Sequence, residues 1–124
     1  MNLIFGGAYQ GKLDYARETF SVKEIFVCDE ARAELDFTKD TIYGLESFVL
    51  ACIRSDIEAV DYLQEHIGQM DGKTVICTDF SQGIVPIDRK LRALRETTGR
   101  VMIYLAKEAN SVTRVFCGLG QKIK

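Results

Sequence analysis

The feature that most restricts the possible folds is a glycine-rich loop near the start of the chain. It lies between an apolar run typical of a strand and an apolar spacing typical of a helix. Residues 2–5 form a short apolar run that ends at Gly6 and Gly7, which is typical of a buried strand entering a tight turn. Residues 12–20 carry apolar side chains three and four positions apart, as on one face of a helix. A second apolar run, rich in β-branched and aromatic residues, follows at residues 24–28. This order predicts a strand, a loop, a helix and a parallel strand.

Two longer helices are predicted in the rest of the chain. One apolar face runs over residues 45–67, and Gly68 then occupies the position of a helix C-cap. Farther on, Asp88 is suited to cap a helix that continues past Gly99 to residue 109. Residues 31–35 fit a single helical turn.

Further strands are predicted between these helices. Residues 74–78 and 112–117 are apolar runs rich in β-branched side chains, whereas residues 41–43 are too short to assign and the last residues form a short tail. Strands that alternate with helices predict an α/β fold in three layers, with a mainly parallel sheet covered on both faces. Parallel sheets bind ligands at the carboxyl ends of their strands, so we expect the functional site at that edge.

Composition narrows the classes of protein that this fold could serve. With 124 residues, 47% apolar and 27% charged, the chain is expected to form one domain, residues 1–124, with an ordinary core. A net charge of −2 offers no basic surface for bulk nucleic-acid binding, and the apolar runs are too short to span a membrane. No positive charge precedes the first apolar run, so we expect no signal peptide and a cytoplasmic location.

The cysteines and the single histidine are predicted to be structural. They are Cys28, Cys52, Cys77, Cys117 and His66. No two cysteines form a C-x-x-C pair, so their spacing does not suit a zinc site and favours small apolar core positions. Cys28, Cys77 and Cys117 come at strand ends, which leaves a redox role as an alternative. His66 comes late in a helical stripe, at a surface or half-buried position.

The loop after the first strand fits G-x-x-x-x-G-K, the pattern of a phosphate-binding loop. Its residues are Gly6, Gly7, Ala8, Tyr9, Gln10, Gly11, Lys12 and Leu13. In such loops backbone N–H groups surround a polyphosphate, glycines permit close approach, and the helix N-terminus adds a favourable dipole. Lys12 would place its charge on the β- and γ-phosphates. The alternative is a glycine turn that merely joins a strand to a helix.

Two further features could complete a nucleotide site. Leu13 lacks the hydroxyl that normally binds Mg²⁺ in this loop, but Asp79 follows a strand at a place where an acidic residue often holds the ion. The alternative for Asp79 is an ordinary turn aspartate. A basic stretch on the helix after Asp88 could contact a polyphosphate or could be a solvated face. Its members are Arg89, Lys90, Arg92, Arg95 and Arg100.

Four segments together resemble the adenosylcobinamide kinase/adenosylcobinamide-phosphate guanylyltransferase family. The loop at residues 6–12 is similar to the family's G-G-x-x-S-G-K-S, and residues 83–86 read Gly-Ile-Val-Pro, like its G-I-V-P segment. Residues 95–100 resemble F-R-x-x-x-G-R, and residues 117–124 resemble the ending S-G-I-G-x-K-I-K. The resemblance covers a little over half of the chain.

This resemblance implies a reduced RecA-like P-loop NTPase fold and a role in cobalamin biosynthesis. Family members phosphorylate the alcohol of adenosylcobinamide with ATP or GTP and Mg²⁺, attach GMP through a histidine intermediate, and assemble as oligomers. The resemblance implies nucleotide binding at residues 6–13, with Lys12 and Asp79 as catalytic residues and Asp79 as the Mg²⁺ ligand. The implied partners are a nucleotide, a corrinoid such as adenosylcobinamide, and further copies of the chain.

The chain departs from the family at positions that the family's activity needs. Residues 29–40 contain no histidine to carry GMP, so we predict that guanylyl transfer is lost. Leu13 and Gln10 replace two serines of the loop, and no counterpart of the family's middle strand is evident. Three functions stay open. The first two are a nucleotide-dependent kinase acting on a cobinamide-like alcohol and a non-catalytic nucleotide-binding protein of the corrinoid pathway. The third is a redox or structural domain whose glycine loop is accidental.

Overall fold

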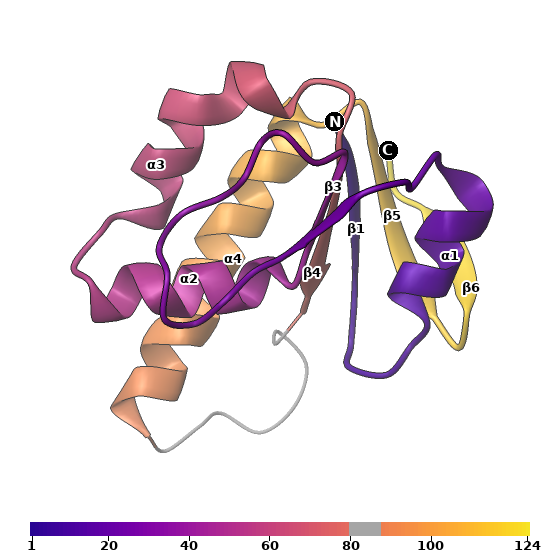
Figure 1. Cartoon of the computed structure of the whole chain (residues 1–124). Coiled ribbons are helices and arrows are strands. Elements are labelled where there is room, and N and C mark those ends of the chain that lie inside the picture. Colours follow the sequence, from indigo (N-terminus) through magenta and orange to yellow (C-terminus); the bar gives the residue numbers. More distant parts are fainter. Residues whose placement is uncertain (80–87) are drawn as a thin grey trace.

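A computed structural model describes residues 1–79 and 88–124, which contain a six-stranded mixed sheet. The strands are β1 (Asn2–Gly6), β2 (Ile25–Val27), β3 (Thr41–Tyr43), β4 (Thr74–Thr78), β5 (Ser111–Phe116) and β6 (Leu119–Lys122). They lie in the order β2-β3-β4-β1-β5-β6 (Figure 1). All neighbouring pairs are parallel except β5 with β6. The predicted α/β fold with a mainly parallel sheet is therefore confirmed.

Helices cover both faces of this sheet. They are α1 (Lys12–Thr19), α2 (Leu45–Arg54), α3 (Ala59–His66) and α4 (Arg89–Glu108). Helix α1 lies on one face, and α2, α3 and α4 lie on the other (Figure 1). The three layers that the sequence predicts are present. No helix in the described ranges is both long enough and apolar enough to cross a membrane.

Strand β1 is buried on both sides because its alternate residues face two different cores. Leu3 belongs to the larger core under α2, α3 and α4, whereas Ile4 belongs to a smaller core with Ala16 of α1. Both strand side chains are fully buried. Burial on both faces explains why this segment is a continuous apolar run.

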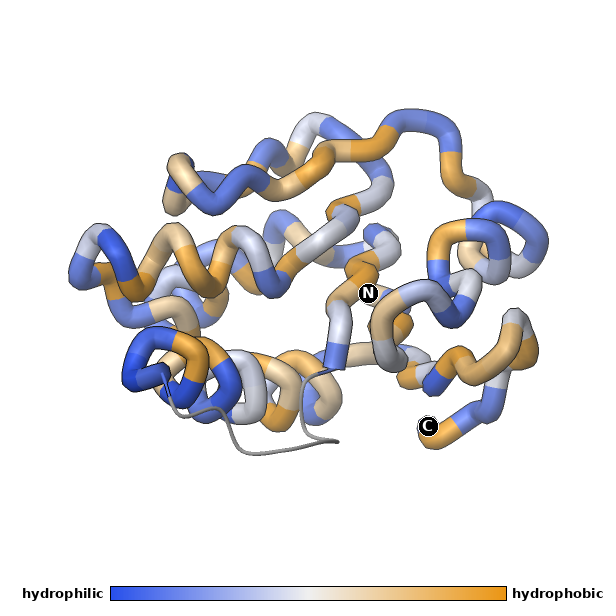
Figure 2. Tube along the Cα trace, turned by 90° about the horizontal axis from the view of Figure 1, so that it is seen from below, coloured by the Kyte–Doolittle hydropathy of each residue, from blue (hydrophilic) through white to orange (hydrophobic). Residues whose placement is uncertain are grey.

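The first turns of α4 are largely hydrophilic, as the view from below shows (Figure 2).

The single helix predicted over residues 45–67 is wrong. Helix α2 ends at Arg54, and Asp56 adopts a left-handed conformation with φ 54°. A new helix then starts, because the Glu58 side chain accepts the Val60 N–H at 3.3 Å as an N-cap. Both helices bury apolar residues against the same core, so the periodicity continues across the break. Gly68 is not a C-cap, since it lies inside a 3-10 turn, Ile67–Met70.

The strand predictions also need correction at two places. Residues 41–43 do form a strand, β3, which is stabilised by parallel pairing with β2 and β4. The C-terminal tail forms β6, reached through a tight turn in which Cys117 and Gly118 have φ of 51° and 76°. Residues 31–35 contain no helix. The other elements are close to prediction, and Asp88 caps α4 by accepting the Lys90 N–H at 2.7 Å.

Candidate phosphate-binding site

The glycine loop joins the end of β1 to the start of α1, at the carboxyl edge of the sheet. A Cβ at Gly6 would collide with the carbonyl oxygen of Val115, so the strand end must be glycine for β5 to lie this close. Gly11 has φ 84°, and a Cβ there would lie 3.3 Å from the Cα of Gly118. Tyr9, at the exposed tip, also has a positive φ of 58°. The strand–loop–helix context predicted for the motif is present.

The backbone of this loop presents donors that the protein does not use. Within the described residues, the N–H groups of residues 7–11 donate to no protein acceptor. The N–H groups of the first turn of α1 also lack intrahelical partners, as at any helix N-terminus. A loop of unpaired amides leading into a helix N-terminus is suited to an anion, because several donors and the helix dipole act on one point.

Lys12 folds back into the loop. Its Nζ donates to the carbonyl oxygen of Gly7 at 2.6 Å, and the residue is only 7% exposed. Burial lowers the pKa of the Lys12 ammonium, and the nearby charge of Glu46 opposes that shift. The cation is therefore held inside the loop and partly desolvated, where its attraction for a phosphate would be stronger than at an exposed site.

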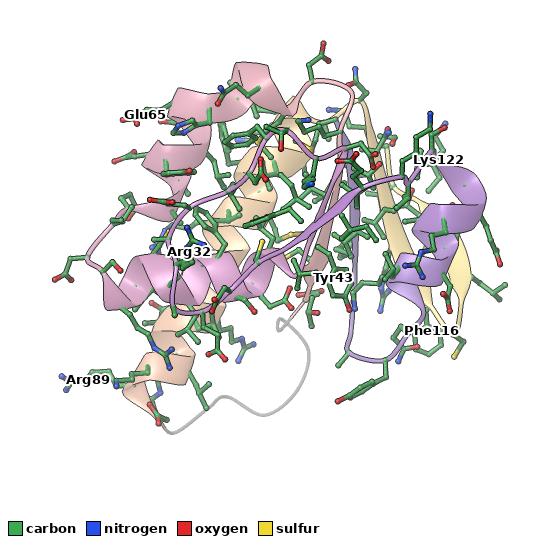
Figure 3. All side chains as sticks on the ribbon, viewed as in Figure 1. Arg32, Tyr43, Glu65, Arg89, Phe116 and Lys122 are labelled. Atoms are coloured by element: carbon green, nitrogen blue, oxygen red, sulfur yellow. The ribbon has the colours of Figure 1, made fainter. Side chains whose placement is uncertain are left out.

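The loop is held in place by the turn between β5 and β6. Gln10 accepts two hydrogen bonds from that turn: its Oε1 from the Cys117 N–H at 2.7 Å and its carbonyl oxygen from the Gly118 N–H at 2.8 Å. The glutamine that departs from the family pattern therefore has a structural role here. Figure 3 shows the neighbouring Phe116 at the end of β5 and Tyr43 at the end of β3, both toward the same edge of the sheet.

Two carboxylates lie at the end of β4, beside the loop. The Asp79 N–H donates to the Gly6 carbonyl oxygen at 2.8 Å, and the Glu46 Oε1 accepts the Thr78 N–H at 2.9 Å. Burial raises the pKa of the Cys77 thiol well above 9.0, and Glu46 and then Asp79 raise it further. Both acids therefore act on the same buried group, as does Lys12, which lowers that pKa.

Glu46 was not among the site residues predicted from the sequence. The residue lies in the first turn of α2, directly after β3 and Gly44, whose φ is 76°. Its signal was an acidic residue two positions after a strand-end glycine, but that signal depends on assigning residues 41–43 as a strand. Once β3 is placed beside β4, Glu46 must lie at the same edge as Asp79.

Leu13 has a structural reason to be apolar. Its side chain packs against the smaller core, which contains Ile4 and Ala16. This position therefore contributes to holding α1 on the sheet and provides no oxygen for Mg²⁺. Glu46 and Asp79 carry the oxygen ligands that Mg²⁺ prefers, and a Mg²⁺ ion commonly combines one or two carboxylates with phosphate oxygens. In the part of the chain that the structure describes, no cluster of three or more His, Cys, Asp or Glu could hold a metal ion.

The basic stretch on α4 divides in two. Arg89 and Lys90 are exposed, and Figure 3 shows Arg89 projecting away from the first turn of the helix. Arg92 and Arg100 are also exposed and Arg95 is half-buried, but these three line a cavity between α4 and the sheet, which also includes Asp79. The segment at residues 83–86 that resembles the family lies outside the described residues.

The structural interpretation of the cysteines is confirmed for three of four. Cys28, Cys52 and Cys77 are buried, whereas Cys117 is exposed on the tight turn before β6, which corrects its assignment to the core. Burial raises the pKa of Cys28 to about 12 and that of Cys52 to about 11, so neither is an activated thiolate. His66 is half-buried as predicted, and its ring stacks with those of Tyr62 and Phe37.

No protein-family model and no curated protein matches this chain. The α/β fold alone does not assign an activity, because such folds carry many unrelated functions. The features of this chain that bear on its function are therefore the loop, Lys12 and the two carboxylates beside them.

Proposed function

We propose that this chain binds the phosphates of a purine nucleoside triphosphate, ATP or GTP, in the loop of residues 6–13. The observation that carries the proposal is the set of amides at residues 7–11, which donate to no acceptor among the described residues, around the buried Lys12. A phosphate entering the loop would accept from these amides, and Lys12 Nζ would exchange its bond to Gly7 for one to phosphate. The exchange replaces a neutral acceptor with a charged one, which makes a stronger hydrogen bond.

The resemblance extends this proposal to phosphoryl transfer onto the alcohol of a cobinamide-like corrinoid. In that reaction the alcohol oxygen bonds to the γ-phosphorus, the bond to the nucleoside diphosphate breaks, and the alcohol proton leaves to a base. Lys12 and the loop amides would stabilise the charge on the transferred group. Asp79 and Glu46 would hold Mg²⁺, which neutralises phosphate charge when bound. The alternative is a non-catalytic nucleotide-binding protein, which Leu13 favours because the loop offers Mg²⁺ no hydroxyl.

Thermal shift and calorimetry with ATP, GTP and GDP, each with and without Mg²⁺, test the binding proposal. A ligand at 100 times its Kd stabilises the folded state by about 2.7 kcal/mol, which raises Tm by several degrees. Lys12→Met should abolish the shift. Lys23→Met makes the same chemical change at an exposed site and should retain it. Equal shifts for both variants, or none for the wild type, would overturn the proposal.

Incubation with adenosylcobinamide separates the two functions. A kinase converts it to the phosphate in the presence of Mg²⁺ and the nucleotide that binds. A nucleotide affinity that does not depend on Mg²⁺, together with the absence of phosphorylated product, identifies the non-catalytic alternative.

A further inference from the structure

A second candidate site lies between α4 and the sheet. It is a cavity of about 1050 Å³, with apolar surface from Phe5 and Val112 on the sheet side, Ile103 on α4, and Ile123 after β6. This volume is at the upper end of the range found for small-molecule sites. None of residues 6–13 lines the cavity, although Asp79 borders both the cavity and the glycine loop.

The charged groups around the cavity favour a ligand with one negative charge. Among the described residues, three arginines and two acids line it, which leaves an excess of one positive charge. They are Arg92, Arg95, Arg100, Asp79 and Glu96. Arg100 donates to the neutral hydroxyl of Thr97 at 3.2 Å and has no carboxylate partner among the described residues. Its charge is therefore the one that an acidic ligand could neutralise.

The helix wall beside Arg100 has two features that the protein's own packing does not explain. Thr98 is 2% exposed, and its hydroxyl has no hydrogen-bond partner in the described structure, although a buried polar group without a partner is destabilising. Gly99 lies inside the 20-residue helix α4, where glycine costs about 0.8–1.0 kcal/mol relative to alanine. A Cβ at Gly99 would meet nothing within 4 Å, so no contact within the described protein requires glycine there.

We propose that this cavity binds a small molecule with a bulky apolar body and a single acidic group. The acidic group pairs with Arg100, the hydroxyl of Thr98 supplies a further donor, and Gly99 lets the apolar body approach the helix backbone. Phe5, Ile103, Val112 and Ile123 remove that body from water. The inference does not depend on nucleotide binding at the glycine loop.

Two dyes that share an aromatic body test this directly. Anilinonaphthalene sulfonate carries one sulfonate, and phenylnaphthylamine is the same molecule without it. The wild type should bind the sulfonate dye at one saturable site, seen as a blue-shifted fluorescence increase, and should bind the neutral dye more weakly. Saturating ATP should not displace the sulfonate dye, and Lys12→Met should not alter its binding.

Substitutions on α4 separate the parts of the proposed site. Arg100→Gln should weaken the sulfonate dye about tenfold or more and leave the neutral dye unchanged, because it removes one charged partner. Gly99→Leu should weaken both dyes by filling the cavity, whereas Gly99→Ala adds one methyl group and should retain both. Thr98→Val should raise Tm without dye and lower affinity for the sulfonate dye, which are opposite effects of one lost hydroxyl.

Circular dichroism of each variant confirms that it is folded before dye is added. Wild-type affinity in Gly99→Leu would place the dye on the exposed apolar side chains of β5 and β6 and overturn the proposal. Equal loss of both dyes in Arg100→Gln, or displacement by ATP, would also overturn it.

Discussion

The amide N–H of Gly118 donates to the carbonyl oxygen of Gln10 at 2.8 Å, which joins the turn before the last strand to the glycine loop. The Gln10 side chain adds a second bond to the Cys117 N–H at 2.7 Å. The hairpin of β5 and β6 thus holds the glycine loop, which lies more than 100 residues earlier in the chain, in place. The amides of residues 7–11 find no acceptor among the described residues, so the loop's shape is restrained by these two bonds and by the bond from Lys12 Nζ to the Gly7 carbonyl oxygen.

Gln10→Ala should therefore loosen the loop. Losing the bond to Cys117 is expected to cost about 1 kcal/mol of unfolding free energy, measured in urea, and to weaken nucleotide binding. Gln10→Glu keeps an acceptor oxygen at the same position and serves as the control. If Gln10→Ala unfolds at the wild-type urea midpoint, the side-chain bond contributes nothing to stability.

Two glycines should respond to alanine with opposite signs. Gly6→Ala places a methyl group against the Val115 carbonyl oxygen, so β1 and β5 must separate and stability should fall by more than about 1 kcal/mol. Gly99→Ala meets no atom within 4 Å and should raise stability by about 0.5–1 kcal/mol, as expected inside a helix. Urea midpoints measure both, and a stable Gly6→Ala variant would contradict the close approach of the two strands.

Lys12→Met should change stability in a pH-dependent way. Burial lowers the pKa of Lys12 from 10.5, so the folded state carries a penalty for the protonated amine below that lowered pKa. The penalty disappears as pH rises to 10.5, where the unfolded chain also loses its proton. Methionine has no such penalty, so the stability difference, Lys12→Met minus wild type, should decrease as pH rises. If this stability difference instead grew with pH, the pKa of Lys12 would be raised in the folded state, which would contradict the prediction.

The buried thiols should make the protein less stable in alkali. Cys28 and Cys52 have pKa values raised from 9.0 to about 12 and about 11, so they stay protonated in the folded state while the unfolded chain ionises. Their stabilisation is complete below pH 9 and is lost as pH rises toward these values. Each contributes a slope of about −1.4 kcal/mol per pH unit in that window. Cys52→Ala should make the slope shallower by one such contribution, measured in urea with a reductant.

Thiol labelling should distinguish Cys117 from the other cysteines. It is exposed on the turn before β6, whereas Cys28, Cys52 and Cys77 are no more than 7% exposed. We expect one thiol to react rapidly with a disulfide reagent in the native protein and all four in denaturant. Cys117→Ser should remove the rapid phase, and a second rapid thiol in the native state would contradict the burial of the other three.

The sequence predicted those elements whose side-chain pattern reports burial directly. Strands β1 and β4, the loop at residues 6–13 and the Asp88 cap of α4 all follow from local residue types at fixed spacing. The α/β class and the coverage of both faces follow from their alternation. The proposed role of the loop also comes from its sequence, since the glycines and Lys12 are adjacent in the chain.

Tertiary structure decided the rest, because a hydrophobic period reports which residues are buried and not where hydrogen bonds break. The hydrophobic period of residues 45–67 therefore could not show the break between α2 and α3, because both helices face the same core. Strands as short as β3 and as exposed as β6 form only because a neighbouring strand supplies their partners. Placing β3 beside β4 in turn brings Glu46 to the loop, and pairing β6 with β5 places the turn at Gly118 against Gln10.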